Sequence, residues 1–169
     1  MQVKRLSISS YNVNGFSEGK SIAMSKLFEK STFMLLQETW LNDNAFSSKF
    51  RDEISKKSVY VSDNKMDLSN KGGVSICYNL NVGNKVETIP TNSKCICAKK
   101  IIIGEISLVL INVYMPCTDT VDDLDKYSSI LQEISTICIK SLTPMIIIGG
   151  DWNADSRRND GRKNSSKSL

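Results

Sequence analysis

The sequence alternates between short apolar runs and longer segments in which apolar residues recur with the spacing of a helix. The runs that have the length and β-branched content of strands are residues 3–11, 33–37, 59–61, 73–78, 95–103, 106–114 and 145–148. Helical spacing covers residues 20–30, the repeat of Phe46, Phe50 and Ile54, and residues 122–140. Strands interleaved with helices predict an α/β layered domain with a mixed β-sheet.

The segment 122–140 has the clearest helix pattern. Thr120 and Asp123 resemble a capping box at its start. One apolar stripe is expected to face the sheet, formed by Leu124, Tyr127, Leu131, Ile134 and Cys138.

Polar residues follow several of the predicted strands at the point where each strand ends. These residues are Asn12, Glu38, Asn112 with Tyr114, and Asp151 with Asn153. In open α/β sheets, ligands bind at the carboxyl ends of the strands. If the strands are neighbours, two carboxylates and several amides meet at one rim. The alternative is that these polar residues simply end their strands.

The chain contains no histidine, and this absence limits its chemistry. It excludes Ser-His-Asp and Cys-His nucleophiles, histidine-ligated zinc and a histidine general base. The five cysteines show no Cys-x-x-Cys spacing and lie mostly in apolar runs, which predicts buried, reduced thiols in an intracellular protein. No apolar stretch has the length of a signal peptide or a membrane span, so we expect a soluble protein that is not secreted.

The net charge of +4 is concentrated at the end of the chain. Residues 156–169 hold five basic residues and one acidic residue, which leaves 17 of the 22 basic and 17 of the 18 acidic residues before them. We therefore expect a neutral domain over residues 1–155 and a disordered basic Ser/Asn/Arg/Lys tail over residues 156–169. Such a tail can bind nucleic-acid phosphates or can simply be solvated.

Short motifs occur in a fixed order along the chain: Tyr11-Asn12-Val13-Asn14-Gly15, Leu36-Gln37-Glu38-Thr39, Gly72-Gly73-Val74, Val113-Tyr114-Met115-Pro116 and Gly150-Asp151-Trp152-Asn153. In this order the sequence resembles the exonuclease–endonuclease–phosphatase (EEP) superfamily, which includes apurinic endonucleases, deoxyribonuclease I and several phosphoesterases. The versions of these motifs in this sequence are most similar to those in the endonuclease domain of non-LTR (LINE-type) retrotransposons. The resemblance implies a DNase I-like sandwich, with residues 1–155 as the N-terminal part of the domain.

The resemblance also implies a role for each site residue. Glu38 would be the principal ligand of Mg²⁺ or Mn²⁺, and Asn12 would help to order that metal site. Asp151 would orient or activate the attacking water, while Asn153 and Tyr114 would donate hydrogen bonds to the phosphate. Asn14, at a position where some relatives carry Asp, would bind substrate. DNA would be the substrate and the nucleus the place of action.

The sequence departs from the family pattern after Asn153. Family members carry a second half with another catalytic Asp and a closing Ser-Asp-His, and these are absent here. We therefore expect an incomplete C-terminal half, weak or no activity of the chain alone, and self-association through an exposed sheet face. Three alternatives stay open: a phospholipid or inositol phosphate phosphoesterase of the same superfamily, a non-catalytic nucleic-acid-binding fragment, and a relic without function.

Overall fold

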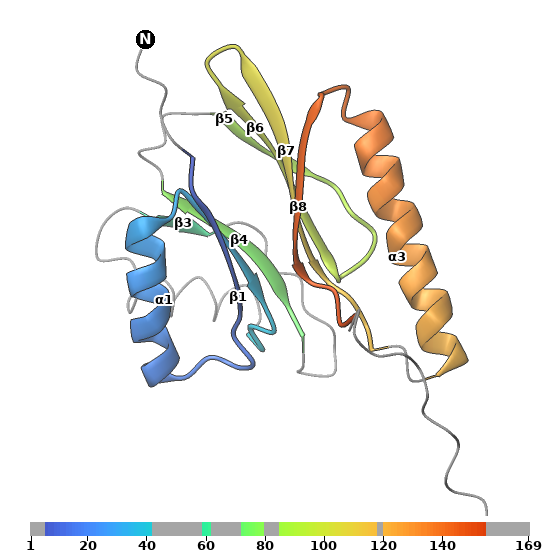
Figure 1. Cartoon of the computed structure of the whole chain (residues 1–169), viewed down its shortest axis with the longest axis horizontal. Helices are drawn as coiled ribbons and strands as arrows, with labels where there is room; N and C mark the ends of the chain where they lie inside the picture. Colours follow the sequence, from blue (N-terminus) through green and yellow to red (C-terminus); the bar gives the residue numbers. More distant parts are fainter. Residues whose placement is uncertain (1–5, 42–58, 62–71, 80–84, 118–119, 155–169) are drawn as a thin grey trace, which may run out of the picture.

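The computed structural model describes residues 6–41, 59–61, 72–79, 85–117 and 120–154, whose strands form two four-stranded sheets (Figure 1). The first sheet has the order β1 (Ile8–Asn12), β2 (Phe33–Gln37), β4 (Val74–Asn79) and β3 (Val59–Val61). The second has the order β5 (Lys85–Ile89), β6 (Ile96–Ile103), β7 (Ile106–Tyr114) and β8 (Met145–Asp151). The described helices are α1 (Glu18–Lys30) and α3 (Val121–Lys140). Neither combines the length and apolar character needed to cross a membrane.

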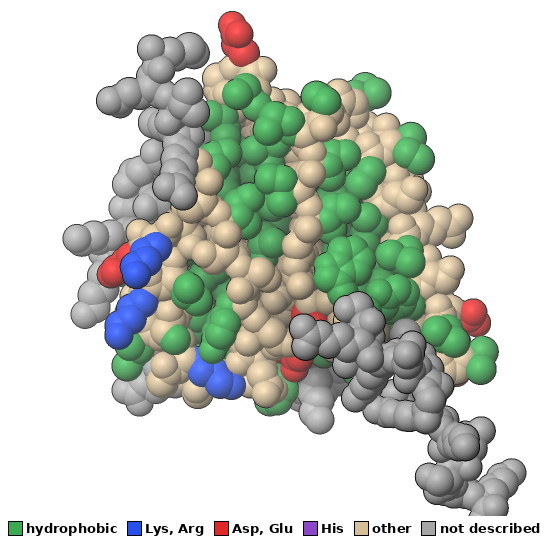
Figure 2. Space-filling model, viewed as in Figure 1, with side chains coloured by type: hydrophobic (Ala, Val, Ile, Leu, Met, Phe, Trp, Pro, Cys, Tyr) green, Lys and Arg blue, Asp and Glu red, His purple; other side chains and the backbone are tan. Residues whose placement is uncertain are grey.

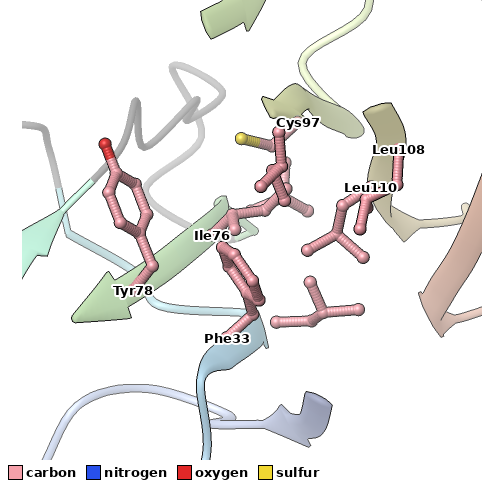
Figure 3. Packing of buried hydrophobic residues seen from close by; sticks show 9 residues of the cluster. Phe33, Ile76, Tyr78, Cys97, Leu108 and Leu110 are labelled. Atoms are coloured by element: carbon pink, nitrogen blue, oxygen red, sulfur yellow. The ribbon is translucent and has the colours of Figure 1, made fainter. Parts of the chain in front are cut away.

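The sheets face each other, and one helix lies on each outer surface (Figure 1). The alternation of side chains along β2 shows how this packing arises, because all five of its residues are buried. Phe33 and Leu35 point into the core between the sheets, together with Ile76, Leu108 and Leu110 (Figure 3). The next residues along β2, Met34 and Leu36, pack under α1 against Met24 and Phe28. The result is the expected α/β layered sandwich, with mixed sheets.

Each sheet is mixed because it contains one parallel pair among antiparallel ones. β1 runs parallel to β2, and β7 runs parallel to β8. The remaining neighbours, including the β6–β7 hairpin, are antiparallel. The two parallel pairs carry the predicted site residues at their carboxyl ends.

Helix α3 confirms the predicted capping box, since Thr120 and Asp123 exchange hydrogen bonds at its start. The predicted apolar stripe is wrong in part. Ile130, Ile134 and Ile137 are the residues that the helix buries against the second sheet. Leu124 and Leu131 are 53% and 42% exposed, because a helix rotated to bury the three isoleucines turns these leucines outward.

Two strands differ from the sequence pattern. β5 is not predicted from the sequence, because its residues Lys-Val-Glu-Thr-Ile are largely polar. In the structure it is the edge strand of the second sheet, where polar side chains can face solvent. β8 continues past the predicted end at Ile148 to Asp151, because Gly149 and Gly150 pair with β7. A Cβ at Gly150 would lie 2.0 Å from the carbonyl oxygen of Val113, so only glycine fits there. The helix predicted around Phe46, the start of the first strand at Val3 and the basic tail lie outside the described residues.

Among the described strands, β1 and β8 are each the last of their sheet, and they lie on the same side of the sandwich (Figure 1). Apolar side chains gather on this side, on both sides of the β8 backbone (Figure 2). Met145, Ile147 and Ile148 of β8 are 45%, 37% and 38% exposed, whereas Leu108, Leu110 and other central residues of β7 are buried. β8 carries no charged residue before Asp151, so this edge has none of the charges that commonly prevent strand pairing between molecules.

Candidate active site

One side-chain amide links the two sheets at the ends of their strands. Asn12 is the last residue of β1, Glu38 directly follows β2, and Asp151 ends β8. Asn12 Nδ2 donates to Glu38 Oε1 at 2.7 Å and to Asp151 Oδ2 at 2.6 Å. Both hydrogens of this amide are used, and two carboxylates from distant parts of the sequence lie side by side.

The register of the parallel pairs explains this meeting. Asn12 pairs with Gln37, so Glu38 follows beside the end of β1. Tyr114 pairs with Asp151, so both stand at the same end of the second sheet. The structure thus brings together four predicted site residues at the carboxyl ends of their strands, where α/β sheets commonly bind ligands.

Tyr114 lies beside this cluster, close enough for the negative charges of Glu38 and Asp151 to act on its phenol. Burial is the largest of the causes that raise the pKa of Tyr114 to about 12, and the negative charge of Glu38 is the next. The phenol therefore stays protonated at neutral pH and remains a hydrogen-bond donor beside a carboxylate.

Asn153 lies beside the cluster and is fixed by two hydrogen bonds. Its backbone N–H donates to Asp151 Oδ1 at 3.0 Å, and its Nδ2 donates to the carbonyl oxygen of Met115 at 2.5 Å. Since Met115 N–H in turn donates to the carbonyl oxygen of Asp151, the chain after β7 is tied to the chain after β8. One amide hydrogen of Asn153 is therefore already engaged, and the other has no acceptor among the residues that the structure describes.

Asn14 lies next to the carboxylates but does not join them. Its side chain is exposed and forms no hydrogen bond with the described residues, while its backbone N–H donates to Asn12 Oδ1 at 3.0 Å. Lys20 Nζ donates to the carbonyl oxygens of Asn14 and Gly15 at 2.6 and 3.2 Å. Lys20 thus holds the loop after β1 and places a cation near the site. Sequence pattern did not indicate this contact, because a lysine in a short helix usually points to solvent.

Asn112 is not at the rim where the sequence suggested it, because its side chain is fully buried between the sheets. Its Nδ2 donates to the carbonyl oxygens of Leu36 and Ser75 at 2.8 and 2.9 Å. Its Oδ1 accepts from Gln37 Nε2 at 2.6 Å. Asn112 therefore joins β7 to β2 and β4, and it supports the site from below. Sequence analysis did not identify Gln37 as the partner of Asn112, because a polar residue at the end of an apolar strand commonly just ends the strand.

The backbone around the site is strained. Asn14, Glu38, Trp40 and Asn153 have positive φ angles of 47°, 52°, 53° and 46°. For residues other than glycine, such angles commonly cost about 1–3 kcal/mol and occur where the surroundings enforce them. The indole of Trp40 covers Gly15 so closely that a Cβ at Gly15 would lie 2.5 Å from the ring.

The available donors fit a hard divalent cation. Glu38 and Asp151 are adjacent anions, and a cation beside them would relieve their repulsion. Mg²⁺ binds through one or two carboxylates and keeps several waters, so it does not need a larger protein cage. The described residues contain no group of three His, Cys, Asp or Glu side chains that could hold a metal. A site for Mg²⁺ or Mn²⁺ would therefore rest on Glu38, with Asp151 and Asn12 beside it.

Solved structures share this fold. The endonuclease domain of TRAS1, a telomere-specific non-LTR retrotransposon, matches with a TM-score of 0.64 and 17% identity over 89% of this chain and 62% of its own. An AP endonuclease from Archaeoglobus fulgidus matches with a TM-score of 0.67 and 18% identity over 89% of this chain and 58% of its own. The 3′ phosphatase NExo from Neisseria, bound to a product DNA hairpin, matches with a TM-score of 0.64 and 14% identity over 88% and 58%.

The chain thus spans less than two thirds of the length of these three proteins. No curated protein matches it in sequence. Residues 9–169 match the Endonuclease/Exonuclease/phosphatase family, and this range includes every residue of the site described above. The chain therefore belongs to the Endonuclease/Exonuclease/phosphatase family.

Proposed function

We propose that this protein is a metal-dependent phosphodiesterase that nicks DNA, of the type found in non-LTR retrotransposons. The observation that carries the proposal is the amide of Asn12 that holds Glu38 and Asp151 together. Membership of the family and the DNase I-like fold support it. Action on chromosomal DNA would place the protein in the nucleus.

The contacts in the structure support the roles that the family resemblance implies for these residues. Glu38 would hold Mg²⁺ or Mn²⁺, and Asn12 would orient that carboxylate. When bound, the metal would polarise the scissile phosphate and stabilise charge on the leaving oxygen. Asp151 would orient the attacking water, as the resemblance of its motif implies, and the hydrogen bonds from Asn12 and Asn153 would hold its carboxylate in place.

Two donors would serve the phosphate as charge develops. Tyr114 is a protonated phenol, and Asn153 has one amide hydrogen that no acceptor in the described part of the chain engages. Losing one such donor typically costs about a hundredfold or more in rate. Asn14, exposed at the mouth of the site, would contact the substrate beside Lys20.

The reaction is expected to be slow. The chain contains no histidine, so no imidazole can transfer a proton during the reaction. General acid–base catalysis of that kind typically contributes about 10²–10⁴-fold.

Conversion of supercoiled plasmid to its open circular form, with Mg²⁺ or Mn²⁺ and with EDTA, tests the proposal. We expect slow nicking that EDTA stops and that Glu38→Gln reduces by about a hundredfold or more. Glu29→Gln, an exposed carboxylate of α1, is the matched control and should leave the rate unchanged. Nicking that survives both EDTA and Glu38→Gln would contradict the proposal. Release of inorganic phosphate from an inositol phosphate, measured with Mg²⁺ and with EDTA, tests the other substrate class of the superfamily.

Residues 156–169, which hold five basic residues and one acidic residue, suggest a second hypothesis. In this hypothesis the chain binds nucleic acid without cleaving it. Phosphate contacts release counterions, so the logarithm of affinity falls with the logarithm of salt concentration. If the tail makes these contacts, deleting residues 156–169 will flatten that slope, and an unchanged slope excludes this reading. A chain that neither nicks nor binds DNA would be a relic.

A further inference from the structure

A cavity of about 610 Å³ opens beside the catalytic phenol. It lies between the residues before β4, the loop that joins β5 to β6, and one face of α3. Tyr114 is part of its lining, so the cavity shares a wall with the proposed active site. Its volume is in the range of sites that bind small organic ligands.

Two glycines keep this cavity open at the end next to Tyr114. Gly72 and Gly73 line it and have φ angles of 103° and 93°, which residues with a side chain rarely adopt. A Cβ at Gly72 would meet nothing closer than the Tyr114 ring, at 4.0 Å. The space next to the phenol is therefore free of described side chains on this wall.

The charge of the lining favours an anion. Glu133 is its one carboxylate among the described residues, and both of its oxygens accept backbone N–H groups, from Asn92 at 2.5 Å and from Ser93 at 3.0 Å. Lys126 also lines the cavity and forms no ion pair within the described part of the chain. Ser129, one turn of helix further, adds a hydroxyl.

Apolar groups complete the lining. Ile130 of α3 and Pro116, which follows Tyr114 by two residues, present flat or branched apolar surface. A ligand that matches the whole cavity would have one anionic group and one flat, largely apolar group. A nucleotide has this chemistry, with a phosphate on one side and a base on the other.

We propose that this cavity binds the nucleotide next to the scissile phosphate, with its phosphate at Lys126 and Ser129 and its base against Ile130 and Pro116. The assignment rests on the proposed function, because Tyr114 would face the reacting phosphate on one side and the cavity on the other. A second cavity of about 430 Å³ lies further along α3, where Lys140 and Ile137 line it. Tyr114 does not line this second cavity, which makes it an internal control.

Binding of thymidine 5′-monophosphate, followed by NMR in EDTA, tests the inference without any hydrolysis. We expect saturable shifts at Gly72, Gly73 and Ser129. Ser129→Trp, which fills the cavity, should weaken binding by about tenfold. Ser128→Trp adds the same indole at the neighbouring exposed position, which does not line the cavity, and should change affinity by less than about twofold.

A second pair of variants separates charge from volume and leaves the fold intact. Lys126→Gln should weaken binding, whereas Lys140→Gln at the second cavity should not. Inorganic phosphate and thymidine alone identify the recognised group, and each should bind more weakly than the nucleotide. Equal affinity for inorganic phosphate, or equal loss in Ser128→Trp and Ser129→Trp, would overturn the inference. Since no metal or turnover is involved, failure here is distinct from failure of the nicking assay.

Discussion

The amide of Asn12 donates a 2.6 Å hydrogen bond to the carboxylate of Asp151, and this bond joins the outer strands of the two sheets across 139 residues of sequence. The same nitrogen donates to Glu38. The side chain of Asn12 therefore both joins the two sheets and positions the two carboxylates of the site. Variants of Asn12 can test stability and activity together.

Replacing Asn12 with alanine removes the donor shared by the two carboxylates. Hydrogen bonds to charged groups contribute about 1.5–3 kcal/mol each, and partial exposure reduces this, so we expect the free energy of unfolding to fall by about 2 kcal/mol. Urea denaturation followed by circular dichroism measures the change. Asn14→Gly is the control, because Asn14 has an exposed side chain and a φ of 47° that glycine tolerates. Equal losses in both variants would show that the Asn12 bonds contribute nothing specific.

Asn112→Asp tests the buried connection between the sheets without changing its volume. Aspartate cannot donate to the carbonyl oxygens of Leu36 and Ser75, so the variant loses both hydrogen bonds and places carboxyl oxygens against two carbonyl oxygens in the core. We expect a loss of about 3 kcal/mol or more in the free energy of unfolding. Gln132→Glu, the same change from amide to carboxylate at an exposed position of α3, should change it by less than about 0.5 kcal/mol. Comparable stability of the two variants would refute the role assigned to Asn112.

The raised pKa of Tyr114 predicts a loss of stability in alkali. An unfolded tyrosine releases its proton near pH 10, whereas Tyr114 in the folded protein holds it to about 12. The stabilising contribution is fully present below pH 10 and is lost as the pH rises from about 10 to about 12. The slope of unfolding free energy against pH should be shallower in Tyr114→Phe over this window. In Glu38→Gln, absorbance at 295 nm should show Tyr114 ionising at lower pH, and an unchanged titration would contradict the contact.

The apolar edge of β8 predicts self-association. Met145 and Ile148 are exposed on a strand that lacks charges before Asp151. We expect sedimentation velocity to show dimers or larger species, and Ile148→Lys to shift them to monomer. Ile22→Lys, which changes an exposed isoleucine on α1, is the control and should leave the distribution as it was. A wild-type chain that sediments as a monomer at all concentrations would refute the expectation.

Local pattern was enough to predict much of the fold. Apolar runs located β2, β6 and β7 to within a residue or two, and the capping box located the start of α3. These features depend on neighbours in the sequence, where spacing and side-chain type are sufficient. The motifs with Asn12, Glu38, Tyr114 and Asp151 also pointed to residues that the structure brings together.

Other features depended on contacts between distant segments. The sequence did not indicate β5, whose polar residues become a strand only because β6 offers its backbone groups. It placed Asn112 at the rim, but the packing of two sheets buried that amide and supplied Gln37 as its partner. The face that α3 presents, the extension of β8 to Asp151 and the cavity beside Tyr114 arose in the same way. The spacing of apolar residues shows which side chains are suited to burial. The register of each strand, the rotation of each helix and the close contacts between segments depend on the surface against which each element packs.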